Sequence, residues 1–382
     1  MKILHTSDWH IGKKLMGRER YDEYRSSLSE ISAICEREEI ELVLVAGDVF
    51  DTYTPSAEAE RIFYEGVKQI AEFSAVLVIS GNHDDYVRLT AASSFASEAN
   101  VYIVGNNLQK LNCNSTFAVK PIRSGNGYAV FEGKNGDKVY INILPYPNEA
   151  RFKEGKSDES FEDKMSRWIA YGERGKQEKM PSIFLSHIFV AGGKVCDGER
   201  EIDLGGARVV PTSMLPGSDY CALGHLHRRQ KLKGNAYYSG AIMQFSFDEA
   251  GAEKSVNVFN LGNDGITGFK QIALTSSKNL IRLQANGAED GVKLLKSNEN
   301  RYVELTLNIS APLTPAESSA LHECENLISL KANVALTESS GLRVSNKDKS
   351  SSQIFTEFYK TKYDCPPSEE LLSLFLSLTE EE

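Results

Sequence analysis

The chain has 382 residues, with 43 Lys and Arg against 53 Asp and Glu and a formal net charge of −10. Hydrophobic residues make up 41% of the chain and charged residues 25%, which is typical of a soluble globular protein of two or three domains. This composition excludes a protein that is basic overall, so any binding of nucleic acid must depend on a local basic patch.

The sequence also lacks the patterns of secretion and of membrane insertion. Residues 1–8 become polar before the apolar region of a signal peptide could form. No apolar run approaches the ~18 residues that a membrane span needs. The 6 cysteines are irregularly spaced and form no CxxC pair, which indicates free thiols in a reducing compartment. We therefore expect a cytoplasmic protein without membrane contact.

The N-terminal part alternates short apolar runs with helical patterns, which indicates an α/β fold. Strands are expected at residues 2–6, 41–46 and 75–80. A helix is expected at residues 21–38, where apolar side chains recur at helical spacing. Thr54 and Pro55 are expected to open the next helix, as its N-cap and its first helical residue.

A second set of strands is expected further along the chain, at residues 140–144, 182–186, 220–223, 237–240 and 256–259. The charged segment 158–175 has helical spacing, so we expect a solvated helix that covers part of a sheet.

The character of the sequence changes near residue 278, where a small α+β module begins. It should contain a strand starting at Leu280, a half-exposed strand at residues 303–309 and a helix opened by Thr314 and Pro315. Residues 339–352 are rich in Ser, Lys and Asn and indicate a linker. Beyond it, two short amphipathic helices are expected. Their apolar faces comprise Ile354, Phe355, Phe358 and Tyr359, then Leu371, Leu372, Phe375, Leu376 and Leu378.

Side chains that can bind metal ions follow five of the predicted strands. They are Asp8 and His10; Asp48 and Asp51; Asn82, His83 and Asp84; His187; and His225 and His227. Because the carboxyl ends of strands in an α/β sheet meet at one edge, we expect these side chains to share a cleft. Five of the 7 histidines belong to this set. The other two, His5 and His322, we expect to be a structural residue and a surface or packing residue.

The spacing within the set suits a pair of metal ions. Residues two apart in an extended segment face the same side, so Asp8 and His10 can face one ion together. A carboxylate such as Asp48 has two oxygens and can bridge two cations. Two-metal hydrolytic sites hold such ions roughly 3.5–4 Å apart. Imidazole, carboxylate and amide ligands favour manganese, iron or zinc.

Taken singly, several of these residues have simpler interpretations. Asp8 could be a helix N-cap, Asn82 a turn residue and His187 a satisfied buried histidine. Asp51 could either stabilise the turn before Thr54 or contact the side chain of a metal ligand without binding the ion itself. Only the whole set, in this order and at these strand ends, favours a metal site.

Together the motifs resemble the calcineurin-like metallophosphoesterases. The resemblance rests on residues 5–13 (HTSDWHIGK), 46–51 (AGDVFD) and 80–84 (SGNHD), with His187 and residues 224–227 (GHLH). It covers the whole chain and extends to the DNA nuclease subunits of this superfamily. The implied fold is α/β: a calcineurin-like metallophosphoesterase β-sandwich flanked by helices, plus a small α+β cap domain and a C-terminal helix-loop-helix.

The resemblance also implies the domain limits and the roles of the site residues. The domains would be a nuclease domain at 1–275, a DNA-capping domain at 276–338, a linker at 339–352 and a helical partner-binding segment at 353–382. Two divalent ions, usually Mn²⁺ in this family, would be held by Asp8, His10, Asp48, Asn82, His187, His225 and His227. His83 would act on the scissile phosphate or the leaving oxygen, and Asp84 would orient its imidazole.

The activity implied by the resemblance is the hydrolysis of DNA phosphodiester bonds. It comprises ATP-dependent 3′-to-5′ exonuclease and single-strand or hairpin endonuclease activities, in DNA recombination, replication and repair. The implied partners are DNA, an SMC-like ATPase that docks on the C-terminal helices, and a second copy of the chain. No GxxxxGK[ST] loop occurs in the sequence, so ATP would be used by the partner.

Two basic stretches lie next to the metal motifs. Lys13, Lys14 and Arg18 follow His10, and Arg228 and Arg229 follow His227. A solvated loop is the simpler interpretation of each stretch, but their position beside the cleft favours contact with DNA phosphates.

Two other functions remain open on the sequence. The chain could be another hydrolase of the same superfamily, acting on a phosphoprotein or a small phosphodiester. It could also be a scaffold that has the fold without catalysis, although the complete ligand set argues against this.

Overall fold

The computed structural model describes residues 1–152, 158–177, 179–195, 208–334, 351–363, 365–369, 371–372 and 375. The chain divides into two compact units. One comprises Met1–Asn308 and Leu313–Asn333, and the other comprises Ile309–Pro312 and Val334–Glu382. Within the described residues, no helix has the length and apolarity that crossing a bilayer requires.

A six-stranded sheet has the order β13-β12-β1-β2-β3-β4. Its strands are β1 (Lys2–Thr6), β2 (Leu42–Ala46), β3 (Ala75–Ile79), β4 (Val101–Val104), β12 (Ser255–Gly262) and β13 (Gly265–Ala273). Strands β1 to β4 run parallel to one another, and β12 and β13 are antiparallel to their neighbours. The strands predicted at residues 2–6, 41–46, 75–80 and 256–259 are confirmed. The sequence did not predict β4 or β13.

A seven-stranded sheet has the order β10-β11-β9-β8-β7-β6-β5. Its strands are β5 (Lys120–Gly125), β6 (Tyr128–Glu132), β7 (Lys138–Leu144), β8 (Ser182–His187), β9 (Tyr220–Gly224), β10 (Gln230–Lys231) and β11 (Ala236–Tyr238). The pairs β7–β8, β8–β9 and β9–β11 are parallel. Three of the four strands expected in this region are confirmed, and the strand expected at residues 237–240 instead runs from Ala236 to Tyr238. The sequence did not predict β5, β6 or β10.

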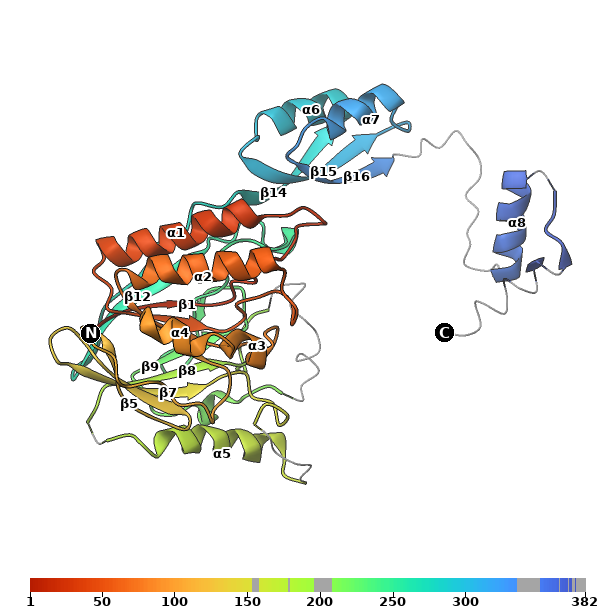
Figure 1. Ribbon diagram of the computed structural model, residues 1–382. Helices are drawn as coiled ribbons and strands as arrows, with labels where there is room; N and C mark the ends of the chain where they lie inside the picture. Colours follow the sequence, from red (N-terminus) through yellow and green to blue (C-terminus); the bar gives the residue numbers. More distant parts are fainter. Residues whose placement is uncertain are drawn as a thin grey trace. The chain divides into compact units, whose positions relative to one another are not determined.

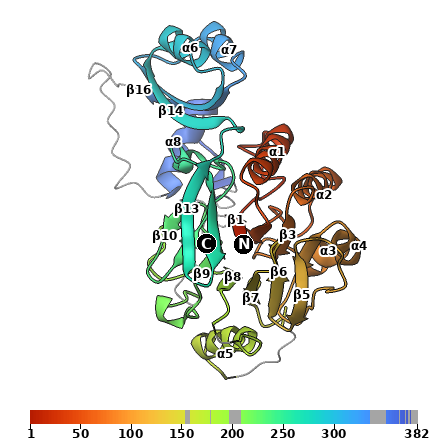
Figure 2. The same cartoon turned by 90° about the vertical axis from the view of Figure 1, so that its left-hand side faces the viewer.

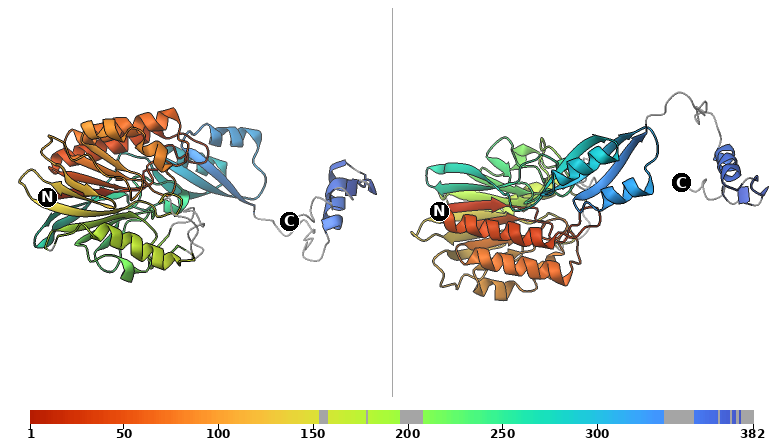
Figure 3. Two further views of the ribbon diagram at one scale, coloured as in Figure 1. Left: turned by 60° about the horizontal axis from the view of Figure 1, so that its bottom comes forward. Right: turned by 90° about the horizontal axis from the view of Figure 1, so that it is seen from above.

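The two sheets pack face to face, with helices on both outer surfaces (Figure 1). Alternate residues of β2 point to opposite sides: Val43 packs against α1 (Tyr21–Arg37) and α2 (Ala57–Ala71), and Leu44 packs against the second sheet. On the far side, α5 (Phe161–Glu173) covers the second sheet, and Figure 3 shows α2 and α5 on opposite sides of the sandwich. The expected sandwich flanked by helices is therefore confirmed.

Two of the helix expectations need correction. Helix α2 begins at Ala57, not at Pro55, because the Ser56 hydroxyl caps it by accepting a hydrogen bond from the Ala59 N–H at 3.1 Å. Helix α5 is not merely a solvated cover, since its Met165 and Trp168 are buried beneath the second sheet.

The expected small α+β module is present. It contains β14 (Asn279–Asn286), α6 (Ala288–Lys296), β15 (Arg301–Ile309), α7 (Pro315–His322) and β16 (Leu327–Val334). Its sheet has the order β14-β15-β16, and Figure 2 shows α6 and α7 on one side of it. Thr314 caps α7 in a capping box with Glu317, as predicted. β15 is not half-exposed, because it is the central strand, and its Glu304 is buried between Arg282 and Lys331.

This module, the cap, is anchored to the first turn of α1. The Glu23 carboxylate accepts hydrogen bonds from the Lys278 N–H and the Tyr302 hydroxyl, both at 2.9 Å. Arg20 donates to the same carboxylate through Nε and Nη2. Glu23 therefore joins the helix that follows the first metal motif to the start of the cap.

The C-terminal unit contains α8 (Ser351–Tyr363), which begins two residues before the predicted helical segment. The ring of Phe355 stacks on that of Phe375, with centroids 4.2 Å apart, whereas Ile354 and Phe358 are exposed. Most of the predicted linker, and Leu376 and Leu378, lie outside the described residues. The domain limits therefore stay predictions.

Candidate active site

The loops after β1, β2, β3, β8 and β9 meet at one edge of the sandwich. The Asp8 N–H donates to the Gly47 carbonyl at 3.0 Å, and the His10 N–H donates to the Asp48 carbonyl at 2.9 Å, so the first two loops run side by side. The second sheet joins them through His187, whose Nδ1 lies 2.8 Å from the Ala46 carbonyl oxygen. Motifs that are far apart in the sequence thus form one site.

Four of the candidate ligands have left-handed backbone conformations. The φ angles of Asp8, His10, Asp48 and His225 are 52°, 44°, 51° and 106°. Such conformations cost of order 1–3 kcal/mol each for residues with a side chain and cluster at functional sites. The strands therefore hold these residues in strained conformations that aim their side chains at one point.

Glycines permit the close approach of the loops. A Cβ at Gly81 would overlap the Asp48 carboxylate and its backbone nitrogen. A Cβ at Gly224 would overlap the Ala46 carbonyl oxygen. The positions before Asn82 and His225 thus require glycine, because the loop and strand beside them leave no room for a Cβ.

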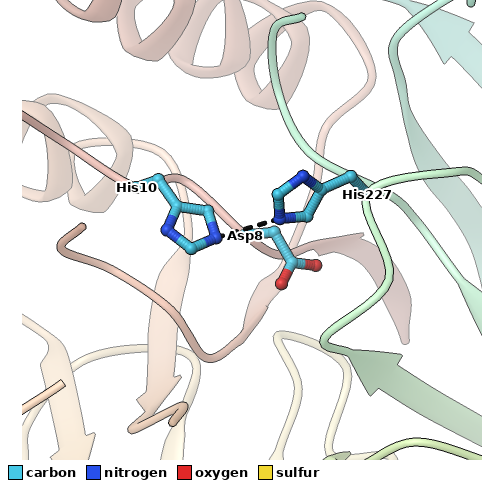
Figure 4. Close-up of side chains that lie close together, drawn as sticks. All are labelled: Asp8, His10 and His227. Atoms are coloured by element: carbon cyan, nitrogen blue, oxygen red, sulfur yellow. Dashed lines mark hydrogen bonds between the residues drawn. The ribbon is translucent and has the colours of Figure 1, made fainter. Parts of the chain in front are cut away.

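Asp8, His10 and His227 form one buried group, with ligand atoms within 4.8 Å of one another (Figure 4). The Nε2 atoms of the two imidazoles lie 3.1 Å apart. Behind them, His10 Nδ1 lies 3.5 Å from Asp51 Oδ1, and His227 Nδ1 lies 3.4 Å from Glu249 Oε1. Of the two interpretations of Asp51, the structure favours support of His10.

A second group forms around Asn82. Its Oδ1 lies 2.8 Å from His187 Nε2 and 3.1 Å from His225 Nδ1. Asp48 lies between the two groups, with Oδ2 at 3.4 Å from His10 Nε2 and 3.5 Å from His187 Nε2. The structure therefore brings all seven predicted ligands together, with Asp48 in the central position.

The buried charges of this site compensate one another. Burial lowers the pKa of His187, but the Asp48 carboxylate raises it to about 9. Burial, reinforced by the charge of His187, lowers the pKa of His225 to about 3. Burial also lowers the pKa of His10 to about 4, despite its contact with Asp51. One imidazole therefore tends to be charged and two to be neutral.

The donor set fits divalent metal ions. Nδ1 of His227 lies 3.4 Å from the Glu249 carboxylate, which only accepts hydrogen bonds, so a proton on Nδ1 leaves Nε2 with a lone pair. Nε2 of His10 lies 3.1 Å from that atom, and both lie beside the Asp8 carboxylate. Nitrogen and oxygen donors gathered in this way suit Mn²⁺, Fe²⁺ or Zn²⁺.

The predicted catalytic pair is arranged differently from the expectation. Nδ1 of His83 lies 2.7 Å from the Asp51 carbonyl oxygen, which orients the imidazole. The Asp84 carboxylate accepts hydrogen bonds from the backbone N–H groups of Val49, Phe50 and Gly81 at 2.8–3.2 Å. Asp84 thus ties the loop after β3 to the loop after β2, which contains Val49 and Phe50. The imidazole of His83 thus contacts the Asp51 carbonyl and not the Asp84 carboxylate, whose predicted orienting role stays a prediction.

Sequence reasoning missed three residues that support the site. Arg151 donates to the carbonyl oxygens of Gly81 and Asp84 at 2.8 and 2.7 Å, which fixes the loop after β3. Glu249 and Lys254 form a buried ion pair behind His227. No recognisable motif surrounds these residues, so the sequence offered no signal for them.

The five predicted DNA contacts have different environments. Lys13 pairs with Asp51, Lys14 with Glu19 and Arg229 with Glu253, while Arg18 donates to the Glu325 carbonyl of the cap. Arg228 is exposed. These residues remain predicted contacts.

The two remaining histidines have the environments that were expected. His5 is buried, with Nδ1 2.9 Å from the Tyr220 hydroxyl, and is structural. His322 lies at the surface of α7, with Nδ1 2.8 Å from the Ser318 carbonyl oxygen.

Sequence comparisons with known proteins agree with the fold. A sequence profile of the calcineurin-like phosphoesterases matches residues 1–229. The chain is 34% identical, over an alignment of 399 positions, to the D subunit of the SbcCD nuclease of Bacillus subtilis (strain 168), covering 99% of this chain and 97% of that protein. It is 26% identical over 373 residues to the protein of the same name from Staphylococcus epidermidis (strain ATCC 12228 / FDA PCI 1200), covering 95% and 94%. Among solved structures, GAP50, the anchor in the inner membrane complex of Plasmodium, matches with a TM-score of 0.44 and 12% identity over 73% of this chain and 85% of that chain.

The chain belongs to the calcineurin-like phosphoesterase family. Within this family it resembles the D subunits of SbcCD nucleases along its whole length. It is therefore a phosphoesterase with a candidate site for divalent metal ions.

Proposed function

We propose that the chain is the nuclease subunit of an SbcCD-type complex and hydrolyses DNA phosphodiester bonds with two metal ions. One observation carries the proposal: the seven ligand side chains from five strand ends meet around Asp48, with His83 beside them. The similarity to the D subunits of SbcCD nucleases over 99% of the chain supports the choice of substrate.

The ligands divide into two sets that share Asp48. Asp8, His10, Asp48 and His227 would hold one ion, and Asp48, Asn82, His187 and His225 would hold the other. We propose Mn²⁺ in both, since these mixed donors suit it. Bound there, the ions would polarise the phosphoryl oxygens and stabilise the attacking and leaving oxygens of an in-line displacement.

His83 supplies the proton chemistry of the chain itself. Its Nδ1 lies 2.7 Å from a carbonyl oxygen, which can only accept, so Nδ1 carries a proton. Nε2 must therefore carry a second proton, in the imidazolium form, to give one to a leaving oxygen, and the positive charge of that form can also stabilise the phosphate. The ring lies edge-on to His10, with centroids 4.8 Å apart, which puts it next to the metal ligands. Asp51 and Asp84 hold the surrounding loops in place.

The substrate would be DNA, bound through Lys13, Lys14, Arg18, Arg228 and Arg229 and shaped by the cap. With SbcC, an SMC-like ATPase, the complex would act as an ATP-dependent 3′-to-5′ double-strand exonuclease. It would also act as a single-strand and hairpin endonuclease, in DNA recombination, replication and double-strand break repair in the cytoplasm.

Two surfaces would mediate assembly. Ile354 and Phe358 are exposed on α8 and would dock on SbcC, since exposed apolar side chains in groups mark interaction sites.

The second surface lies on the nuclease domain. Val87 on α3 (Tyr86–Thr90) and Phe95 on α4 (Ser93–Glu98) are 61% and 76% exposed. They would contribute to a homodimer of the nuclease domain.

The test is the cleavage of labelled linear duplex and hairpin DNA with Mn²⁺, with and without SbcC and ATP. We expect the wild type to degrade DNA and His83→Ala to lose roughly 100-fold or more in rate while it keeps its metal ions. His322→Ala, which removes an exposed histidine of α7, is the matched control and should act like the wild type.

The same experiment separates the rival functions. If neither protein cuts DNA under any condition but the wild type cuts a small phosphodiester, the enzyme class is right and the substrate is wrong. If the purified protein binds no divalent ion, the chain is a scaffold and the proposal fails.

A further inference from the structure

The imidazole of His227 has a buried ion pair behind it. Glu249 is 2% exposed, and its Oε1 lies 3.4 Å from His227 Nδ1. Lys254 pairs with the same carboxylate and donates a hydrogen bond to the His227 carbonyl oxygen at 2.9 Å. Backbone and side chain of His227 are thus held by one buried pair of opposite charges.

The contact with Glu249 favours one tautomer of the imidazole. A carboxylate accepts hydrogen bonds, so the proton of a neutral imidazole beside it belongs on Nδ1. Nε2 then has a lone pair and faces Asp8 and His10. Asp51 has the corresponding position behind His10, 3.5 Å from its Nδ1. Both imidazoles of this group therefore have a carboxylate on the side away from the site.

The turn that contains Glu249, η3 (Phe247–Glu249), is held from two directions. On the side of the site, the ring of Phe245 lies edge-on to those of His10 and His227, with centroids 5.4 Å away in each case. On the side of the cap, Asp248 forms an ion pair with Arg282 of β14 at 2.7 Å. Glu249 is therefore fixed by its surroundings rather than by His227 alone.

We propose that Glu249 is a positioning residue that fixes the tautomer and the orientation of His227 for metal binding. This role rests on the proposed function of the site as a metal centre. Glu249 touches neither the substrate nor the reacting atoms. Carboxylates behind a metal-binding histidine raise its basicity and orient its ring, and their loss typically reduces metal affinity 10–100-fold.

The test measures Mn²⁺ affinity by titration calorimetry on the full chain, without DNA. We expect Glu249→Gln to weaken binding about tenfold or more. Because this change leaves Lys254 buried beside a neutral group, a second variant, Glu249→Leu with Lys254→Met, replaces the whole pair. Apolar replacement of a buried ion pair is often neutral for stability, so this variant should fold and still bind Mn²⁺ about tenfold more weakly or worse.

The matched control is Glu289→Gln, which removes an exposed Glu–Lys pair on α6 and should bind Mn²⁺ like the wild type. A second readout is the ¹⁵N NMR signal of histidine in the metal-free protein. We expect His227 to carry its proton on Nδ1 in the wild type and to lose this preference in the double variant.

Wild-type Mn²⁺ affinity in both Glu249 variants, or an unchanged His227 tautomer in the double variant, would overturn the proposal. These readouts involve no DNA. A wild type that binds Mn²⁺ but leaves DNA intact would contradict the nuclease function and not the role of Glu249.

Discussion

The Nε2 atoms of His10 and His227 lie 3.1 Å apart, although the two residues are separated by 217 positions in the chain. One follows β1 of the first sheet and the other follows β9 of the second. Their meeting shows that the site is assembled by the packing of the two sheets. Changes at the contacts between the loops should therefore weaken metal binding, as changes of the ligands themselves would.

Metal binding is expected to release a proton from His187. Burial lowers the pKa of this residue, but Asp48 raises it to about 9, so the imidazole is protonated at pH 7 in the metal-free protein. A metal ion requires the neutral imidazole, so its affinity should rise with pH up to about 9, by roughly tenfold per pH unit for one proton. Calorimetry in buffers of different ionisation enthalpy measures the protons released. A binding heat that does not depend on the buffer would contradict this prediction.

Gly81→Ala is expected to disturb Asp48. The added methyl group would overlap the Asp48 carboxylate and its backbone nitrogen, so the loop after β2 or β3 must move. We expect Mn²⁺ affinity to fall about tenfold or more, together with ~1–3 kcal/mol of stability. Gly217→Ala is the control, because a Cβ there meets no atom within 4 Å. Calorimetry and denaturant unfolding measure both effects, and equal results for the two variants would refute the argument.

Glu23→Ala is expected to loosen the attachment of the cap. The change removes the acceptor of the Lys278 N–H and of the Tyr302 hydroxyl and leaves Arg20 without its ion pair. Hydrogen–deuterium exchange should quicken at residues 275–280, and stability should fall by about 1–3 kcal/mol. Glu19→Ala, which removes an ion pair with the half-exposed Lys14, is the control. Unchanged exchange in the Glu23 variant would mean that other contacts hold the cap.

The cysteines are expected to differ sharply in reactivity. Burial raises the pKa of Cys35 and of Cys221 to about 12, so both thiols stay protonated and inaccessible at pH 8. Cys365 is exposed. Maleimide labelling followed by mass spectrometry should therefore modify Cys365 in the native protein, and Cys35 and Cys221 only after unfolding. Rapid labelling of Cys35 in native conditions would show that α1 opens locally.

The sequence alone was sufficient to predict the three strands β1, β2 and β3 that lead into the site. β1, β2 and β3 are buried on both faces, so each is a continuous apolar run followed by polar residues, and such a run is visible without tertiary information. The mixed composition of β5 and β6 gave no such signal, because their burial is partial and irregular. The N-cap of α2 was placed two residues too early because Thr54, Pro55 and Ser56 all favour a helix start.

The sequence by itself determined which residue types stand at the ends of the strands, and hence the metal chemistry of the site. The tertiary structure decided which side chain supports which ligand. Asp84 follows His83 directly, yet its carboxylate binds amides of another loop, while Asp51 and Glu249 stand behind His10 and His227. Such partners are set by the packing of two sheets and a turn, and no spacing along the chain encodes contacts that arise only when separate strands meet.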